Sequence, residues 1–145
     1  MKITLKTKVE GNYKEVMEKF DINLFEALKP PLADMEIVEF TGSKRGDRVH
    51  IRFNAPIKAE WVSLITEHGH DEHQAYFIDE GEVLPFPLKK WRHKHIVEKI
   101  NESESYIIDE MSFSGSNWLM DIFIYPGILL GFLPRKRIYK KYFSK

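Results

Sequence analysis

Alternation between apolar and polar residues marks several segments of the chain. Between Lys2 and Val9, every second residue is apolar or threonine, and mostly lysines lie between them. Successive side chains of a strand point to opposite faces, so this period of two predicts a half-buried β-strand. The same alternation predicts strands at Arg48–Asn54 and Trp91–Ile100.

Four further segments are predicted as strands, because apolar and β-branched residues lie between turn signals. These segments are Met35–Phe40, Glu60–Glu67, His73–Asp79 and Ser105–Phe113. The predicted turns are Gly42–Gly46, the hairpin turn His68–Glu72, the loop Gly81–Pro87, and a hairpin turn about Glu102-Ser103.

Helix signals lie on both sides of this run of six strands. Asn12 and Asn23 each precede a glutamate by three residues, which predicts the starts of two short helices. Pro30-Pro31 ends the second helix, because proline cannot continue one. The C-terminal segment from Trp118 to Phe143 is predicted to be helical, with breaks at Pro126-Gly127 and at Pro134.

The order of elements is therefore one strand, two short helices, six strands and a C-terminal helix. Hairpin-linked strands with helices at the ends of the run are typical of an α+β domain with an antiparallel sheet. No repeat, low-complexity run or linker divides the chain, so the sequence predicts a single domain over residues 1–145. Such a sheet buries one face and can curl around a helix.

The composition fits a folded domain with a large apolar interior. Apolar residues make up 43% of the 145 residues and aromatic residues 13%, whereas disordered chains are poor in both. Lys and Arg number 22, as do Asp and Glu, so the chain lacks the basic excess with which duplex-binding proteins neutralise phosphates. We therefore expect no nucleic-acid partner.

The absence of cysteine removes a second group of functions. Without it the chain has no disulfide scaffold, no zinc–thiolate site and no thiol nucleophile. The first eight residues alternate charged and apolar groups, whereas a signal peptide needs a continuous apolar stretch. We therefore expect a cytoplasmic protein.

Two histidines and two aspartates are the main candidates for chemistry. Alternation places Trp91, His93 and His95 on one face of a strand whose other face is largely charged. The predicted hairpin turn brings Asp109 opposite or near His95, at a cross-strand spacing of about 5 Å. Asp79 joins them from the neighbouring strand, so an imidazole and a carboxylate come within reach of each other.

Three interpretations of this cluster stay open. The cluster is a buried polar network that satisfies its own hydrogen bonds, a set of polar contacts to a ligand, or an acid–base pair in which a carboxylate orients a histidine. The catalytic interpretation lacks a partnered nucleophile in the sequence. Its candidates are His93, His95 and Asp109.

A second cluster, residues His68 to His73, contains three histidines and two acids within six residues. Such ligands can bind zinc, nickel or copper. The cluster lies on a predicted hairpin tip, and no helical His-x-x-x-His pair frames it, so a solvated turn explains it better. We expect no metal site and no cofactor.

The most apolar part of the chain is Trp118–Leu133, which the basic residues Arg135–Arg137 follow. A membrane span needs about 20 apolar residues without charges or breakers, and this stretch contains Asp121 and Pro126. A buried helix that packs on the sheet and lines a cavity explains the pattern best. The alternative is transient contact with a membrane interface, where the basic residues meet lipid head groups.

The motifs of the second half form an ordered series: Phe77-x-Asp79, Pro85-Phe86, Trp91-x-His93-x-His95 and Asp109. With Gly46-Asp47 before a strand and the ending Arg135-x-x-x-Tyr139-x-x-x-Phe143, this series resembles a bacterial ligand-binding branch of the START-like superfamily. That superfamily, also called SRPBCC, includes birch-pollen-allergen-type proteins and polyketide cyclases.

The resemblance implies a helix-grip fold, in which a curved seven-stranded sheet wraps around a long C-terminal helix and encloses a cavity. It also implies binding of lipids, sterols, polyketides or hormones, with enzymatic activity in only some members. Pro126-Gly127 and Pro134 depart from the pattern, so we expect a kinked or shortened cavity roof.

We therefore predict that the domain binds or transports a hydrophobic small molecule of the lipid, sterol or aromatic polyketide type in an internal cavity. The alternatives are a cyclase- or hydrolase-type enzyme that uses a His/Asp pair, and an interaction module without a ligand. The sequence does not determine the oligomeric state. The expected ligand-binding residues are Phe53, Trp61, Ile65, Phe77, Asp79, Trp91, His93, His95, Asp109, Met111, Phe113, Leu129, Phe132 and Leu133.

Overall fold

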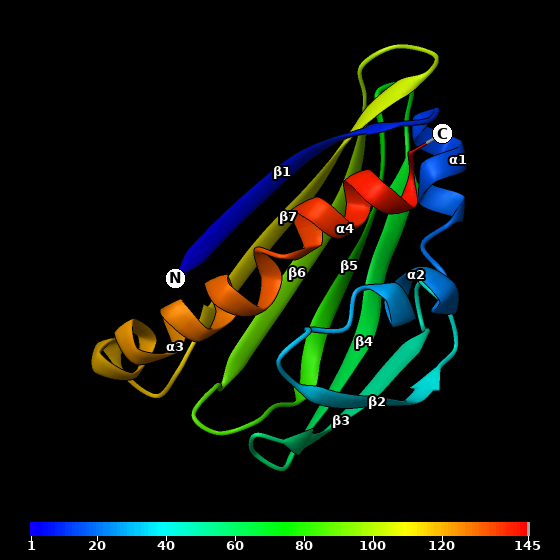
Figure 1. Cartoon of the computed structure of the whole chain (residues 1–145). Helices are drawn as coiled ribbons and strands as arrows, with labels where there is room; N and C mark the ends of the chain where they lie inside the picture. Colours follow the sequence, from blue (N-terminus) through cyan, green and yellow to red (C-terminus); the bar gives the residue numbers. More distant parts are fainter. Residues whose placement is uncertain (145) are drawn as a thin grey trace.

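A single antiparallel sheet of seven strands organises the computed structural model, which describes residues 1–144 (Figure 1). The strands are β1 (Lys2–Glu10), β2 (Asp34–Phe40), β3 (Arg48–Ala55), β4 (Ala59–His70), β5 (Gln74–Val83), β6 (Lys90–Lys99) and β7 (Glu104–Ser114). The helices are α1 (Tyr13–Glu18), α2 (Ile22–Ala27), α3 (Trp118–Phe132) and α4 (Arg135–Tyr142).

The strand order is β1-β7-β6-β5-β4-β3-β2, so every strand from β2 to β7 pairs with its neighbour in sequence. Only β1 leaves this order and pairs with β7 at the far side. The sheet curls, and the C-terminal helices lie along its concave face (Figure 1). The predicted α+β class and helix-grip arrangement are confirmed.

Alternation along the strands matches their burial. In β1 the buried positions are Ile3, Leu5, Thr7 and Val9, and the residues between them are exposed. In β6 the inward positions Trp91, His93 and His95 are likewise buried. The period of two that predicted these strands therefore also gives the correct inward face.

Two apolar clusters fill the concave side of the sheet. The upper cluster joins α1, α2 and α4 to the strands, and the lower cluster joins α3 to the opposite ends of the strands. The upper cluster contains Val9, Tyr13, Val16, Phe20, Leu24, Leu28, Ile65, Ala75, Phe77, Val97, Ile107, Tyr139 and Phe143. The lower cluster contains Ile3, Leu5, Leu88, Trp91, Met111, Phe113 and Ile124.

The C-terminal helix breaks at one of the two predicted points. Pro134 separates α3 from α4, as expected, but Pro126 lies inside α3 and does not end it. Proline removes the hydrogen bond to the carbonyl four residues earlier, which belongs to Ile122. Ile122 is exposed, so water can replace the missing donor there.

Two predicted turns are shorter than expected. β4 continues to His70 and leaves only Asp71 to His73 for the hairpin, where the Asp71 carboxylate accepts two backbone N–H groups. β5 continues through Gly81 to Val83, so the following loop begins at Leu84. A Cβ on Gly81 would lie 2.6 Å from the Leu84 side chain, which indicates that this glycine permits a close approach.

The start of α2 also differs from its prediction. The capping residue is Asp21, whose Oδ1 accepts from the backbone N–H groups of Asn23 and Leu24 at 3.0 and 3.2 Å. Asn23, the predicted cap, lies inside the first turn instead. Aspartate and asparagine are equally good caps, so spacing to a glutamate alone selected the wrong one.

A pair of alanine variants tests whether Asp21 or Asn23 caps α2. Asp21→Ala removes the acceptor for two N–H groups and should lower the free energy of unfolding by about 1 kcal/mol. Asn23→Ala removes an exposed side chain and should change it by less than about 0.5 kcal/mol. Urea denaturation followed by circular dichroism measures both, and the reverse ranking would show that Asn23 is the cap.

Candidate functional site

Four ionisable side chains lie buried on the concave face of the neighbouring strands β5, β6 and β7. Asp79 comes from β5, His93 and His95 from β6, and Asp109 from β7. All four are less than one tenth exposed. They form a polar layer between the upper and the lower apolar cluster.

Strand register places these residues in two facing pairs. His95 is directly opposite Asp109, as the hairpin predicted, and His93 is directly opposite Asp79. The short contacts are nevertheless diagonal: His95 Nε2 lies 2.6 Å from Asp79 Oδ2, and His93 Nε2 lies 2.8 Å from Asp109 Oδ1. The directly opposite pairs are 3.7 and 3.8 Å apart. Each histidine therefore ties β6 to one neighbouring strand, and the two bonds cross.

Stacking fixes the two imidazoles in this arrangement. The rings of His93 and His95 lie 3.6 Å apart at an angle of 27°, and Phe77 stacks on the other side of His95 at 4.1 Å. Phe132 of α3 meets His93 edge-on at 5.5 Å. The polar groups are thus held between aromatic rings, whose stacking adds to the energy of burial.

Further donors reach the two carboxylates. The Trp91 indole N–H donates to Asp79 Oδ1 at 3.0 Å. From α4, the Tyr139 hydroxyl donates to Asp109 Oδ1 at 3.5 Å, and an Arg135 nitrogen lies 3.9 Å from the same oxygen. Each carboxylate therefore has one histidine and at least one further donor.

Arg135 and Tyr139 were not among the predicted site residues. The sequence feature that could have identified them is the four-residue spacing of Arg135, Tyr139 and Phe143, which places the three residues on one face of a helix. Phe143 and Tyr139 belong to the upper cluster, and the Arg135 guanidinium lies over the Phe132 ring at 4.4 Å.

The aspartates carry the negative charge of the layer. Burial alone would raise the pKa of the Asp79 carboxyl, but the His95 hydrogen bond, the two imidazoles and the Trp91 donor together hold it below its usual value. Burial acts in the same way on Asp109, where His93 and Arg135 outweigh it and lower the pKa. Both side chains are ionised near neutral pH and can only accept hydrogen bonds.

His95 is neutral at the same pH. Burial, reinforced by the charge of His93, lowers the pKa of His95 to about 4 despite the Asp79 bond. Because Asp79 only accepts, Nε2 of His95 carries the proton and Nδ1 has a free lone pair. Nδ1 of His95 is the buried side-chain atom that lacks a hydrogen-bond partner in the described chain. Burial also raises the pKa of Tyr139, which keeps its hydroxyl protonated.

A metal ion is one occupant to consider for this layer. Asp79, His93 and His95 each offer a ligand atom, and these atoms lie within 4.8 Å of one another. A metal binds imidazole nitrogen in the plane of the ring, and stacked rings 3.6 Å apart cannot both direct lone pairs at one ion. The observed geometry fits a hydrogen-bonded network better than a metal centre.

Some of the predicted apolar lining residues are buried, and others are partly exposed. Ile65 and Phe77 are buried in the upper cluster, and Trp91, Met111 and Phe113 are buried in the lower one. Trp61, Leu129 and Phe132 are partly exposed and pack against the lower cluster. Phe53 is also partly exposed, and Leu133 is 45% exposed and does not face the interior.

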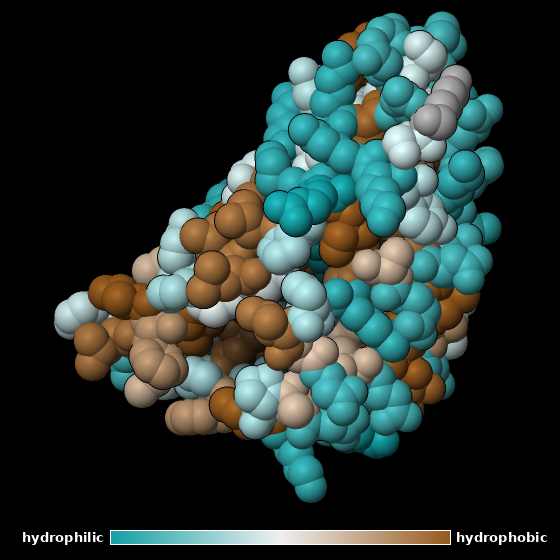
Figure 2. Space-filling model, in the orientation of Figure 1, coloured by the Kyte–Doolittle hydropathy of each residue, from teal (hydrophilic) through white to brown (hydrophobic). Residues whose placement is uncertain are grey.

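A hollow is visible in the surface near α3 (Figure 2). Figure 2 shows a recess with apolar walls between α3 and the segment that leads from α2 to β2. Trp61 and Trp91 meet edge-to-face at 4.9 Å, and Phe132 lies 5.5 Å from Trp91. Trp61 and Phe132 are partly exposed and Trp91 is buried, so the three rings form one aromatic group within the lower cluster.

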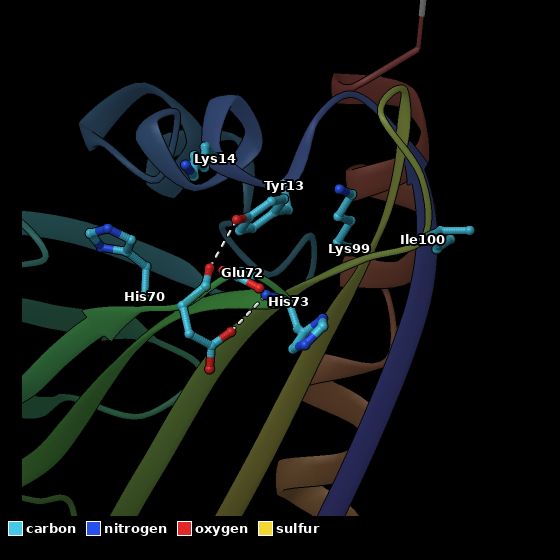
Figure 3. A pocket seen from close by; sticks show the side chains of 8 residues that line it. Tyr13, Lys14, His70, Glu72, His73, Lys99 and Ile100 are labelled. Atoms are coloured by element: carbon cyan, nitrogen blue, oxygen red, sulfur yellow. Dashed lines mark hydrogen bonds between the residues drawn. The ribbon is translucent and has the colours of Figure 1, made fainter.

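A pocket of about 830 Å³ lies at the other end of the sheet and is lined mainly by polar and charged residues (Figure 3). Residues 70 to 73 of the predicted His68–His73 turn line this pocket. His70 and His73 are exposed, and His68 instead accepts a backbone N–H from Arg45. In residues 1–144, the hairpin does not bring three metal ligands together. Its lining residues are Tyr13, Lys14, His70, Asp71, Glu72, His73, Lys99 and Ile100.

Comparisons with known proteins give similarity in structure but not in sequence. No protein-family model and no curated protein matches the chain. A truncated norcoclaurine synthase from Thalictrum flavum superposes with a TM-score of 0.70 at 14% identity, covering 100% of this chain and 94% of that one.

Two further structures extend the same similarity. A hypothetical protein from Helicobacter pylori superposes with a TM-score of 0.72 at 15% identity, covering 99% of this chain and 88% of that one. The Zhui aromatase/cyclase from a Streptomyces species superposes with a TM-score of 0.63 at 10% identity, covering 94% and 93%. At these identities the similarity establishes the fold alone.

The neutral state of His95 predicts a pH-dependent stability. The unfolded chain takes up a proton on this histidine near pH 6.5, whereas the folded chain does so only near pH 4. Between these values the unfolded state binds more protons, so stability should fall by up to about 1.4 kcal/mol per pH unit as pH decreases. The depressed aspartate pKa values add a further loss below the usual carboxyl range.

Denaturation at several pH values checks this expectation. His95→Gln keeps a donor for Asp79 but cannot titrate, so its stability should depend less steeply on pH between 6.5 and 4. His73→Gln removes an exposed histidine and should keep the original slope. Equal slopes in His95→Gln and the parent protein would show that His95 is not held neutral by burial.

Proposed function

We propose, from the helix-grip fold that this chain shares with the START-like superfamily, that the protein binds an apolar small molecule in the recess between α3 and the sheet. The observation that carries the proposal is a partly exposed aromatic wall, formed by Trp61 and Phe132 over buried Trp91, beside a buried polar layer. Binding sites for small molecules combine apolar walls with a few placed polar groups in this way.

The aromatic wall favours a flat ligand. Trp61, Trp91 and Phe132 present rings at different angles, and such rings bind other ring systems with about 0.5–1.5 kcal/mol beyond the energy of area burial. Fused-ring molecules such as sterols or aromatic polyketides therefore fit this wall better than simple chains. The aromatase/cyclase among the structural neighbours is named for chemistry on molecules that become aromatic.

The polar layer would recognise a donor group on the ligand. Phe132 contacts both Trp91 and His93, so this ring lies where the apolar wall meets the polar layer. A ligand hydroxyl or amine that reaches the polar layer would pair with Nδ1 of His95, which lacks a partner. Satisfying a buried acceptor contributes about 1–3 kcal/mol relative to leaving it unpaired.

Titration calorimetry with matched helix variants tests the binding site. At least one class among sterols, fatty acids and polyphenols should bind, and Leu129→Trp should weaken it at least about tenfold by filling the recess. Leu130→Trp is the control, because Leu130 is 69% exposed and should leave affinity unchanged. If no class binds and native mass spectrometry of protein from its own host reveals no small molecule, an interaction module replaces this proposal.

The second candidate function is an acid–base enzyme of the cyclase or hydrolase type. The observation that favours it is the arrangement of His95, a neutral base with a free Nδ1 whose other nitrogen is oriented by Asp79 at 2.6 Å. A carboxylate that fixes the tautomer of a histidine in this way is a recurring element of proton-transfer sites. The candidate base is then His95, and Asp79 rather than Asp109 orients it.

Separate measurements of ligand binding and of turnover distinguish the carrier from the enzyme. If the protein is an enzyme, His95→Gln should lower the turnover of the co-purifying molecule at saturating concentration about 100-fold or more, whereas in a carrier the same variant should change affinity alone. His73→Gln should affect neither, because His73 lies on the exposed hairpin. Liquid chromatography of reaction mixtures measures conversion, and absence of turnover in the parent protein supports the carrier function.

The proposed carrier function extends to a membrane as the source of the ligand. The sequence left transient membrane contact of the C-terminal segment as the alternative to a buried helix, and α3 leaves many of its apolar side chains exposed. Molecules with large apolar surfaces partition into bilayers, so a carrier of such molecules gains from a surface that meets lipid.

A further inference from the structure

Exposed apolar side chains gather at one end of the molecule. In an antiparallel sheet, the loops after β3, β5 and β7 and the loop before β2 all lie at the same end. Three of these loops place a large apolar residue at their tips: Leu32 is 93% exposed, Phe86 81% and Ile57 75%.

Helix α3 continues this surface. It follows β7, and a side chain at Gly115 would meet Pro87 of the loop before β6 and Met120 of α3, so helix and loop are in close contact. Only Ile124 of α3 is buried. The exposed apolar residues of α3 are Trp118, Leu119, Ile122, Phe123 and Leu130. We call Leu32, Ile57, Phe86 and these five residues the apolar end.

The opposite end of the sheet differs sharply. Its hairpin tips carry polar and charged residues, among them Asp71, Glu72 and Glu102. In residues 1–144, the large apolar side chains that are at least 45% exposed all lie in three places. They belong to α3, to the residue directly after α3, or to the loops and strand ends at the same end of the sheet as Leu32, Ile57 and Phe86. Apolar exposure is therefore polarised along the molecule, which single scattered residues would not produce.

The charges near the apolar end that have no ion pair in the described chain are mainly basic, with the exposed Asp34 beside Leu32 as the acidic exception. Lys58 follows Ile57, and Lys89 and Lys90 follow Phe86 in the chain; none of these lysines has an ion pair in the described part of the chain. From residue 115 to residue 144 there are five basic residues and one acidic residue, Asp121. The Asp121 carboxylate is engaged by the Gly115 N–H at 2.6 Å. An anionic surface would therefore meet little repulsion here.

We propose that the apolar end docks the protein on the surface of an anionic phospholipid bilayer. The loop tips and α3 enter the region between head groups and acyl chains, and the lysines contact lipid phosphates. The inference rests on the proposed function for its purpose, because the recess opens beside α3 and would then face the bilayer (Figure 2). A ligand would pass between membrane and recess without crossing water.

The segment lies on the membrane rather than across it. By length and composition alone, Trp118–Tyr142 could span a bilayer, and only 6% of its most apolar window is buried. Yet Tyr139 and Phe143 belong to the upper cluster, and Arg135 reaches the Asp109 carboxylate. A spanning helix would have to pull these side chains out of the core.

Vesicle sedimentation tests the docking. The full-length protein should sediment with phosphatidylcholine vesicles that contain phosphatidylglycerol, and less with phosphatidylcholine alone, because the lysines add electrostatic attraction. Phe86→Asp with Phe123→Asp should lower the partition coefficient at least about tenfold. Val38→Asp places one aspartate at an exposed apolar position of the edge strand β2, away from the apolar end, and should leave partition unchanged.

Tryptophan fluorescence locates the contact. Trp118 is exposed in solution, so its emission should shift to shorter wavelength on vesicles and be quenched by brominated lipid. Trp118→Phe should abolish most of this signal while the protein still sediments. Quenching of the same size in Trp118→Phe as in the parent protein would mean that Trp118 does not contact lipid and would overturn the proposal.

Three results would contradict docking by the apolar end. They are no sedimentation with either vesicle, sedimentation that the double aspartate variant retains, and a dimer in light scattering that this variant dissociates, since a second copy would then cover α3. Titration calorimetry without vesicles keeps the two proposals separate. Ligand affinity that survives in the double variant shows that the carrier function stands when docking fails.

Discussion

The crossed hydrogen bonds between two histidines and two aspartates are the interaction on which the rest of the interior depends. They tie β5, β6 and β7 together by side chains as well as by backbone, and they lie where the upper and lower apolar clusters meet. Burying two carboxylates is costly unless each is paired, so the surrounding donors are needed. Trp91 supplies one from the sheet, and Tyr139 supplies another from α4. The network thereby determines where α4 sits as well as how the strands align.

This anchoring of α4 has a consequence for α3. The Arg135, Tyr139 and Phe143 face fixes the final helix on the sheet, while Pro134 separates it from the preceding one. Beyond that break, α3 is held by Ile124 and a few partly buried neighbours. One half of the C-terminal segment therefore closes the core, and the other half remains available to a ligand or a lipid surface.

Much of the fold could be predicted because strand alternation is a direct consequence of backbone geometry. It gave the inward face of β6 and the opposition of His95 and Asp109. It could not give the crossed bonds, because register positions backbones, whereas the lean of an imidazole depends on the rings stacked against it. The exposure of α3 was missed for another physical reason: a helix that is apolar on all sides shows the same pattern in a core as on an unpartnered surface. Capping failed at Asp21 because two good caps lie two residues apart.

The pairing of β1 with β7 bears on how the chain can be assembled during synthesis. Strands β2 to β6 form successive hairpins and can associate as they emerge from the ribosome. β1 must wait, because its partners lie about a hundred positions later; the Met1 amino group, for instance, donates to the Phe113 carbonyl. Contacts this distant in sequence slow folding. Until β7 is available, the lysines on one face of β1 discourage this unpaired strand from pairing with other nascent chains.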